Sequence, residues 1–591
     1  MSAPHVLIRI GGEGGEGIIS TGDLLSRAAS RQGLCIMTYR TYPAEIKGGL
    51  AQFQMKLASD PIRSIGLRFQ HLMAFNQEAL DAFHDGMLKG GTIYYDPAEC
   101  PDLSKVSGEI ERVPIPLTDL AKEKGGSIRG KNMVALGFLS RLASVDLETV
   151  AGLVREKFKR KGEKVLDSNL ASLNAGYDLG DQTIDGRGVK LTPKSQRGQS
   201  IVISGNEATM LGALAAGCKY MAGYPITPAS SILEFATRHL PRFGGTVVQA
   251  EDEISAMASC IGASFVGKKA MTATSGPGLM LKGELITLAS TQELPVVIID
   301  VQRGGPSTGL PTKQEQSDLK FAIYGTAGEA PKIVVAPATV EDCFYLTAKA
   351  FSLAEEYQMP VIVLSDTNLA VRTETVPEFD VSRVDVAERL RPTPEQMKDY
   401  KRYEDTPTGV SPIIDPGTPG GLHIAPGLEH DEYGTPCYTG VNHTKMNAKR
   451  FRKLETLSKR AEEWMADWAP VEGAELCIIG WGSTKGAIQE ACQMAAERGI
   501  RVSHFHPRIV APLPEAQIRE ALSKVKKVIV VEENFTGQFS HFLKAKFKFD
   551  PVEVLRSMGV PITPDEVLEE IVKVHETLHP AKPQGASYAH R

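Results

Sequence analysis

Short, unbroken runs of β-branched and other apolar residues recur along the chain, and most are followed by a Gly- or Pro-containing turn and an amphipathic helix. Continuous apolar strands are typical of parallel sheets, because helices cover both faces of such a sheet. Parallel strands also need crossover connections, which the intervening helices supply. The alternation therefore predicts an α/β protein whose domains each carry a mostly parallel sheet.

A chain of 591 residues is too long for one hydrophobic core and is expected to form three or four domains. A polar linker near residue 195 and a Pro- and Gly-rich stretch after residue 375 interrupt the alternation. In the second interruption we expect a helix over the charged residues 445–468. The predicted segments are an α/β domain at 1–195, a second at 196–375, a connecting segment at 376–470 and a small α/β domain at 471–591.

Composition excludes several classes of protein. The net charge of -5 gives no electrostatic basis for binding nucleic acid. No apolar run reaches the roughly 18 residues that a membrane span needs, and the N-terminus lacks the pattern of a signal peptide, so we expect a cytoplasmic protein. The eight cysteines form no CxxC pair, which argues against a disulfide framework, a zinc ribbon or an iron–sulfur cluster held by this chain.

The loop "IGGEGGEG" near the N-terminus matches the Gly-x-Gly-x-x-Gly pattern of dinucleotide-binding sites. Glu13 and Glu16 lie inside the loop, where they would repel a pyrophosphate. The next strand ends at Arg40 rather than at an acid that could bind a ribose hydroxyl. We favour glycines that allow tight helix–strand packing, and a bound dinucleotide remains the alternative.

In the second α/β segment, unusual residues follow several strands. "GYPITPAS" places Thr227 in a rigid turn at a helix entrance, "VVQAEDEISA" places Glu251 and Glu253 at a strand end, and "VQRGG" places Arg303 after a buried strand. Ligands of open α/β sheets lie beyond the carboxyl ends of the strands, so these side chains would share one rim. Each also has a structural explanation, as a helix cap, a charge at a helix start or an ion-pair partner.

These stretches resemble the 2-oxoacid:ferredoxin oxidoreductases, and specifically a large subunit in which a gamma-type domain is fused ahead of an alpha-type domain. The similarity spans nearly the whole chain in family order. The stretches that carry it are "GGEGGEG", "GNEATMLGALAAGC", "GYPITPAS", "QAEDEISAMASCIGAS", "TATSGPG", "QRGGPSTGLPT", "PGLEHDEYG" and "VVEENFTGQF". The resemblance implies a gamma-type domain, a pyrimidine-binding domain for thiamine diphosphate and a domain like the transketolase C-terminal domain.

The resemblance implies thiamine diphosphate chemistry, in which a glutamate at a strand end bonds the aminopyrimidine ring and so activates the thiazolium carbon. A carboxylate in apolar surroundings suits this task. Glu253 is the favoured residue, and Glu251 remains open. The residues that the resemblance implies around the cofactor are Pro225, Ile226, Glu253, Ser275 and Gly276.

By the same resemblance, Thr227 and Arg303 hold the carboxylate of the 2-oxoacid, since the planar fork of arginine matches a carboxylate. In relatives the gamma-type turn often reads Ser-Tyr-Gly-Pro-Glu-x-Arg-Gly-Gly, whereas this chain has "TYPAEIKGG". Lys47 stands in place of the arginine. It is a candidate for contact with coenzyme A or with the distal carboxylate of 2-oxoglutarate.

The chain contains no Gly-Asp-Gly motif, which in thiamine enzymes holds the Mg²⁺ of the diphosphate. The resemblance therefore implies a smaller beta subunit that carries Mg²⁺, the diphosphate and a [4Fe–4S] cluster. Ferredoxin would accept the electrons, and a dimer of heterodimers is expected. The fused layout is most similar to 2-oxoglutarate enzymes, with coenzyme A as cosubstrate and a reaction that can also run as a carboxylation.

Alternatives remain open at this point. Within the family, the substrate could be pyruvate or a branched-chain or aryl 2-oxoacid. Outside it, the chain could be a dinucleotide-dependent dehydrogenase or a non-catalytic scaffold of an electron-transfer complex. A metal site in the loop at 406–445 is a further alternative, although its spacings fit no common zinc pattern. Its candidate ligands are His423, His430, Cys437 and His443.

Overall fold

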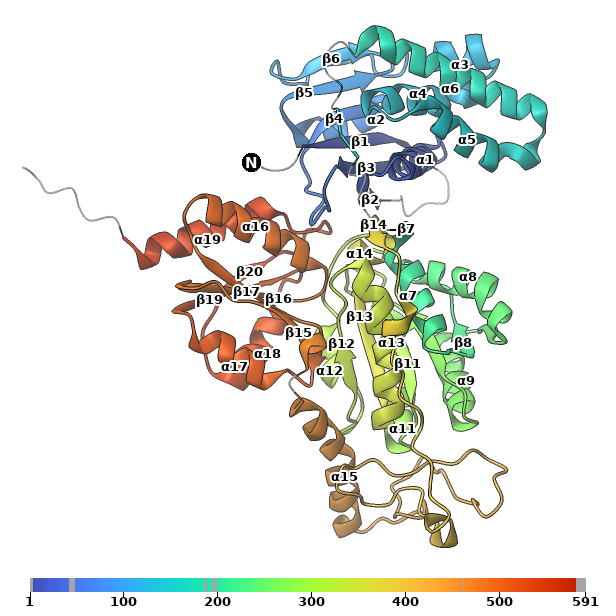
Figure 1. The fold of residues 1–591 in the computed structure, drawn as a ribbon, viewed down its shortest axis with the longest axis vertical. Helices are drawn as coiled ribbons and strands as arrows, with labels where there is room; N and C mark the ends of the chain where they lie inside the picture. The colour runs from blue at the N-terminus through green and yellow to red at the C-terminus, as the bar shows by residue number, and fades with distance from the viewer. Residues whose placement is uncertain are drawn as a thin grey trace, which may run out of the picture.

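The computed structural model describes residues 4–41, 48–184, 188, 190–193, 199–460 and 462–580. Three sheets form three α/β bodies (Figure 1). The N-terminal body lies at one end of the long axis, the central and C-terminal bodies lie side by side below it, and an irregular segment with one long helix projects from the opposite end. Most strand pairs are parallel, which confirms the predicted fold class.

The N-terminal sheet is mixed, because three parallel neighbours on one side of β1 are followed by antiparallel pairs on the other. Its strands, in spatial order, are β6 (Glu111–Pro114), β5 (Met87–Tyr95), β4 (Phe69–Ala74), β1 (His5–Glu13), β3 (Leu50–Ala58), β2 (Cys35–Thr41), β14 (Thr373–Pro377) and β7 (Ser200–Ser204). Its helices are α1 (Ile18–Arg31), α2 (Gln77–Phe83), α3 (Leu117–Gly125), α4 (Lys131–Leu142), α5 (Leu147–Phe158) and α6 (Glu163–Thr183). Strand β3, which the sequence did not reveal, runs antiparallel to β1 and β2. Helix α1 packs closely on it, since a Cβ at Gly22 would lie 2.1 Å from the Phe53 ring.

Strands β7 and β14 extend the N-terminal sheet, although β7 and residues 373–375 of β14 belong to the segment that we predicted as the second domain. The link between β2 and β14 uses threonine side chains as well as backbone. The Thr38 hydroxyl donates to the carbonyl of Thr373 and accepts from its N–H, and the N–H of Ile36 donates to the hydroxyl of Thr375. The N-terminal sheet therefore continues into two strands from the part of the chain that borders the central body.

The central sheet is parallel except at its β18 edge. Its strands, in spatial order, are β18 (Ile509–Ala511), β12 (Ile333–Val335), β13 (Pro360–Asp366), β11 (Val296–Gln302), β10 (Ala270–Thr274), β8 (Tyr220–Gly223) and β9 (Thr246–Gln249). Its helices are α7 (Gly205–Ala215), α8 (Ser230–His239), α9 (Glu253–Phe265), α10 (Gly276–Leu281), α11 (Gly283–Thr291), α12 (Leu319–Tyr324), α13 (Val340–Tyr357) and α14 (Thr367–Val371). The inner strands β10, β11 and β13 are buried along their whole length, as their apolar sequences predict.

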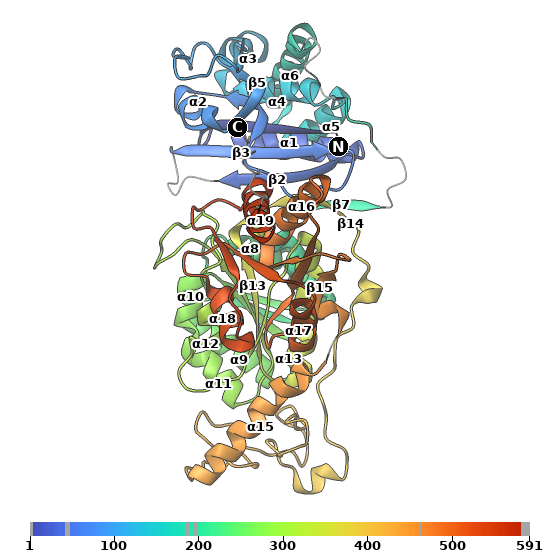
Figure 2. The same cartoon turned by 90° about the vertical axis from the view of Figure 1, so that its left-hand side faces the viewer.

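The C-terminal body packs against the side of the central one (Figure 2). Its strands, in spatial order, are β15 (Ala466–Ala469), β17 (Val502–Pro507), β16 (Leu476–Gly480), β19 (Lys527–Glu532) and β20 (Val552–Leu555). Its helices are α16 (Lys485–Glu497), α17 (Glu515–Ser523), α18 (Gln538–Phe547) and α19 (Pro564–Leu578). Because β18 leaves this part of the chain to pair with β12, one hydrophobic core runs through both bodies.

The connecting segment from residue 378 to residue 439 is mostly irregular, with two short 3-10 turns and one isolated β-bridge between His430 and Pro436, as its Pro and Gly content predicts. Helix α15 (Gly440–Ser458) follows it and ends ten residues before the predicted limit, so the expected helix over 445–468 was wrong in its extent. The chain leaves the helix because Ala466–Ala469 pair with β17 instead. Buried ion pairs from Lys449 and Lys453 to Glu293 attach this helix to the central body.

Candidate active site

Four neighbouring parallel strands of the central sheet end at one rim, and each is followed by a candidate residue. Thr227 follows β8, Glu253 follows β9, Ser275 follows β10 and Arg303 follows β11. Because these strands run parallel, their carboxyl ends meet on the same edge. The structure thus brings the predicted residues to one edge of one sheet.

The three acidic residues that follow β9 lie in three different environments. Glu251 is exposed. Asp252 is the N-cap of α9, where its carboxylate accepts from the N–H of Ser255 at 2.7 Å and its own N–H donates to the Ser255 hydroxyl oxygen. Glu253 occupies the first turn of α9 and is only 6% exposed. Of the two glutamates that the sequence left open, Glu253 alone is enclosed by the protein.

The Glu253 side chain lies against the short helix α10. A Cβ added at Gly278 would lie 2.7 Å from Glu253 Oε1 and 2.1 Å from Thr274 Oγ1, so only glycine leaves room for the carboxylate here. Ser275 and Gly276 begin this helix and are buried, and Ser275 Oγ has no hydrogen-bond partner in the described part of the chain. The rim therefore presents a buried carboxylate and a nearby buried hydroxyl that can each accept a further partner.

Arg303 connects the end of β11 with the turn that follows β8. Its Nη1 donates to the Thr227 carbonyl at 2.6 Å, and the arginine is 7% exposed while Thr227 is exposed. Pro225 is exposed and Ile226 is half-buried in the same turn. The guanidinium is thus held in place by one nitrogen, beside the exposed turn that carries the Thr227 hydroxyl.

Sequence reasoning missed three titratable residues behind this rim, the buried Lys282 and Asp300 and the half-buried Asp318. Lys282 follows α10 and is 0% exposed, with no hydrogen-bond partner for Nζ among the described residues. Burial lowers the pKa of Lys282 to about 8, and the carboxylates of Glu253 and Asp300 offset part of that shift. The available signal was a single lysine within the otherwise apolar run "GPGLMLKGELI".

Asp300 lies near the end of the buried strand β11 and faces Asp318 at the start of α12. Burial raises the pKa of both carboxyl groups, that of Asp318 to about 6. A Cβ at Gly276 would lie 2.8 Å from both Asp318 oxygens, so this carboxyl lies under α10 just as Glu253 does. The negative charge of Asp318 adds to the effect of burial on the pKa of Asp300, because like charges oppose ionisation.

The buried Lys282 predicts an unusual dependence of stability on pH. Its pKa of about 8 in the folded chain is below the ordinary value of 10.5, so the unfolded chain binds more protons between these limits and stability rises with pH across that window. This difference between the two pKa values corresponds to at most about 3 kcal/mol in the free energy of unfolding. Lys282→Met should therefore be more stable than the parent chain at pH 7, and the advantage should disappear near pH 10.5. Urea unfolding of both proteins from pH 7 to 10.5 tests this, and parallel stability curves would contradict it.

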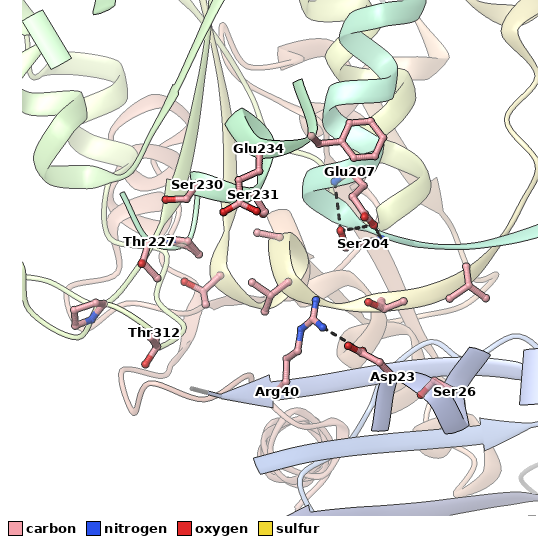
Figure 3. A pocket seen from close by; sticks show the side chains of 18 of the residues that line it. Asp23, Ser26, Arg40, Ser204, Glu207, Thr227, Ser230, Ser231, Glu234 and Thr312 are labelled. Atoms are coloured by element: carbon pink, nitrogen blue, oxygen red, sulfur yellow. Dashed lines mark hydrogen bonds and ion pairs between the residues drawn. The ribbon is translucent and has the colours of Figure 1, made fainter. Parts of the chain in front are cut away.

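A cleft of about 840 Å³ opens beside Thr227, between the N-terminal and central bodies (Figure 3). Three arginines line it, Arg27 and Arg40 from the N-terminal body and Arg238 from α8. Arg40 pairs with Asp23 at 3.3 Å. Three carboxylates, from Asp23, Glu207 and Glu234, and several apolar side chains also line it. Hydroxyl groups come from Ser26, Ser204, Thr227, Ser230, Ser231, Thr312, Thr367 and Thr373. Lys47, the other candidate cation of this region, lies outside the described residues.

The carboxylate of Glu16 fills the glycine loop near the N-terminus. Glu16 Oε2 accepts from the N–H of Glu13 at 2.7 Å and from Asn76 Nδ2 at 3.1 Å, and Oε1 pairs with Lys131 at 2.6 Å. A Cβ at Gly12 would lie 2.6 Å from that carboxylate. The place that a pyrophosphate takes in a dinucleotide site is thus occupied by a side chain, which argues against the dinucleotide alternative.

The structure does not assemble the proposed metal ligands of the loop at 406–445. Each side chain interacts locally, His423 with the carbonyl of Gly421, His430 with that of Leu428, His443 with Glu429 and Cys437 with Thr439. Within the described ranges, no three His, Cys, Asp or Glu side chains gather in a way that could hold a metal ion. In the same ranges no helix is both long enough and apolar enough to span a membrane.

Three family profiles match successive parts of the chain. "Pyruvate ferredoxin/flavodoxin oxidoreductase" matches residues 7–179, "Pyruvate flavodoxin/ferredoxin oxidoreductase, thiamine diP-bdg" matches 211–450, and "Pyruvate:ferredoxin oxidoreductase core domain II" matches 474–567. They follow the three sheets in order along the chain.

Among individual proteins, the 2-oxoglutarate oxidoreductase subunit KorA of Mycobacterium tuberculosis is 37% identical, over 95% of this chain and 90% of its own length. The 2-oxoglutarate synthase subunit KorA of Methanothermobacter marburgensis is also 37% identical, over 63% of this chain and 98% of its own. A solved structure, the 2-oxoglutarate:ferredoxin oxidoreductase of Magnetococcus marinus with 2-oxoglutarate, coenzyme A and succinyl-CoA bound, is 40% identical. It superposes with a TM-score of 0.92 over 97% of this chain and all of that chain.

Proposed function

This chain belongs to the 2-oxoacid:ferredoxin oxidoreductase family, and on that basis we propose that it is the alpha-type subunit of a 2-oxoglutarate:ferredoxin oxidoreductase. The reaction converts 2-oxoglutarate, coenzyme A and two oxidised ferredoxins into succinyl-CoA, CO₂, two reduced ferredoxins and one proton. The observation that carries the proposal is the rim itself, where a buried glutamate and an arginine–threonine pair meet at adjacent strand ends. The 2-oxoglutarate enzymes among the relatives favour this substrate over pyruvate.

The residues around Glu253 fit the aminopyrimidine of thiamine diphosphate. A buried carboxylate, a buried hydroxyl without a partner in the described ranges, and the close approach of Gly278 form a cradle for a flat polar ring. When bound, this cofactor supplies the carbon nucleophile that attacks the 2-oxo group. Glu253 would hold a proton between its carboxylate and the ring nitrogen, while Pro225, Ile226, Ser275 and Gly276 would shape the surrounding wall.

We assign the carboxylate beside the 2-oxo group to Thr227 and Arg303. The Thr227 hydroxyl and the remaining guanidinium nitrogens can donate to one carboxylate, while Nη1 stays on the Thr227 carbonyl. Burial of the arginine reduces competition from water, which strengthens a charge-assisted bond. The assignment gives each of the two residues a direct contact with substrate.

Replacing Arg303 by Lys should raise the KM for 2-oxoglutarate by about 10- to 100-fold, because lysine keeps the charge and loses the fork that binds both Thr227 and the carboxylate. Steady-state kinetics of the complete enzyme measure the effect. Arg242→Lys, an exposed arginine in the turn after α8, is the control and should change KM little. Equal KM values for the parent enzyme and Arg303→Lys would exclude Arg303 from the substrate site.

The cleft beside Thr227 is our candidate for the coenzyme A site. Its volume of about 840 Å³ and its three arginines suit a long ligand with phosphate groups. Because Thr227 lines the same cleft, the cosubstrate and the 2-oxoacid would enter through one opening. Lys47 remains our candidate for the distal carboxylate of 2-oxoglutarate or for coenzyme A.

We infer that a beta subunit completes the site with Mg²⁺, the diphosphate-binding residues and a [4Fe–4S] cluster. Apolar side chains beside Glu253 support a partner on this face, since Ile254, Met280 and Leu281 are 51%, 64% and 52% exposed. A dimer of such heterodimers that passes electrons to ferredoxin in the cytoplasm is the assembly we propose.

The proposed function is tested on the complex purified anaerobically through this chain. Reduction of a viologen dye that depends on coenzyme A is measured with 2-oxoglutarate and with pyruvate in parallel. Activity with 2-oxoglutarate supports the proposal. Activity with pyruvate or a branched-chain acid alone would preserve the reaction class and overturn the substrate. No activity with any 2-oxoacid, from a complex that holds thiamine diphosphate and iron, would overturn the reaction itself.

A further inference from the structure

Lys282 is a buried cation that the proposed reaction does not yet use. It is 0% exposed, and its ammonium has no hydrogen-bond partner among the described residues. Leaving a charge buried without hydrogen bonds costs several kcal/mol, and a purely structural position would be filled better by methionine or leucine. A cation kept at this cost, next to a functional site, calls for a functional explanation.

The position of Lys282 ties it to Glu253. Lys282 lies one helical turn after Gly278, and its N–H donates to the Gly278 carbonyl at 3.2 Å. Gly278 is also the residue on which the Glu253 carboxylate rests, 2.7 Å from the Cβ that glycine lacks. The same short helix therefore carries the lysine and supports the glutamate.

The charged and titratable groups around the ammonium come from two packed elements. Helix α9 contributes Asp252, Glu253 and Cys260, and strand β11 contributes Asp300. Asp252 caps α9, and burial together with the charge of Asp318 raises the pKa of Asp300, which favours its neutral form. Burial raises the pKa of the Cys260 thiol to about 12, which keeps it neutral. Glu253 is therefore the carboxylate in this shell that can gain most from the charge of Lys282.

We propose that Lys282 is a positioning residue for Glu253: its buried ammonium attracts the Glu253 carboxylate and keeps it directed at the ring nitrogen of the cofactor. The inference rests on the proposed function, because it assigns Glu253 to the aminopyrimidine. Loss of the cation removes this attraction, so the carboxylate is no longer held against the ring nitrogen and activation of the cofactor falls.

The test uses the complete complex with thiamine diphosphate bound and measures exchange of the hydrogen on the reactive thiazolium carbon for deuterium. Lys282→Met should slow this exchange by about tenfold at neutral pH. Lys282→Arg, which keeps the charge, should restore most of the rate. Lys268→Met, an exposed lysine three residues after the end of α9, is the matched control and should exchange at the parent rate.

Exchange requires no 2-oxoacid, so the outcomes separate the two proposals. A parent complex that accelerates exchange, together with a Lys282→Met variant that exchanges equally fast over the same pH range, overturns the role of Lys282 alone. A parent complex that does not accelerate exchange over free cofactor overturns the assignment of Glu253, and the inference with it. Urea unfolding of the variant chain separates a loss of folding from a loss of function, because Lys282→Met should be at least as stable as the parent at pH 7.

Discussion

Glu253→Gln lowers the turnover of the complete enzyme by about 10²- to 10⁴-fold, the usual cost of removing a group that transfers a proton. The amide has the shape of the carboxylate and still fits against Gly278 and Thr274. It cannot carry the negative charge that favours a proton on the facing ring nitrogen. Viologen reduction with 2-oxoglutarate and coenzyme A measures the loss, and the thiamine content of the purified complex shows whether binding or activation has failed.

Glu251→Gln is the matched control, because it makes the same change two residues away on an exposed side chain. It should leave turnover within about twofold of the parent value, as expected for a surface substitution. The reverse pattern, with Glu251→Gln inactive and Glu253→Gln active, would move the proton-transfer role to Glu251. Full activity of both variants would favour a non-catalytic scaffold as the role of this chain.

The candidate residues at the ends of apolar strands could be predicted from the sequence, because each of them comes shortly after its strand along the chain. "VVQAEDEISA" places acids after a strand, and parallel pairing then brings them to the rim that Thr227 and Arg303 share. Sequence alone could not separate Glu251 from Glu253. That distinction depends on where Asp252 caps the helix, which turns the next side chain inward.

The charges behind the rim were not predictable in the same way. Lys282 and Asp300 are single charged residues in apolar runs. The neighbouring sequence does not indicate that α10 brings Lys282 close to Asp300 and to Glu253. Strand β14 was missed for a related reason, since its partner β2 lies more than 300 residues earlier in the chain. Local pattern predicts elements, whereas pairings of distant residues depend on the complete packing.

The largest expected loss of stability follows from Glu293→Gln, at the attachment of helix α15. Glu293 Oε1 and Oε2 lie 2.6 and 2.7 Å from Lys449 Nζ, Lys453 also bonds Oε2, and Arg402 donates to the Glu293 carbonyl at 2.7 Å. All four side chains are almost completely buried. The amide would leave two buried ammonium groups without a counter-charge, at a cost of about 3–5 kcal/mol. Urea unfolding measures this loss, and limited proteolysis should show faster cleavage between residues 384 and 439.

An exposed ion pair in the same segment provides the control. Glu395 lies 2.7 Å from Lys398 with both side chains in solvent, so Glu395→Gln should cost less than about 1 kcal/mol. The two ammonium groups hold the pKa of Glu293 well below its usual value of 4.5. Its stabilisation is therefore complete above about pH 4.5 and declines as the pH falls toward the lower folded value. Equal losses for the two variants, or a Glu293→Gln chain with unchanged resistance to acid, would contradict this account.

A combined variant tests whether the buried charges stabilise the fold or only select one docking geometry. Replacing Glu293, Lys449 and Lys453 together by leucine and methionine removes the three charges of the ion pairs and their desolvation cost. Arg402 keeps its hydrogen bonds to the carbonyls of Gln292 and Glu293, so most of the stability lost in Glu293→Gln should return. The penalty of the single change would then come from unpaired ammonium groups rather than from a lost attraction. If the apolar variant recovers stability but the connecting segment is cleaved at the faster rate, the ion pairs fix the position of α15. If stability is not recovered, the pairs themselves contribute net stability, and the desolvation argument fails for this site.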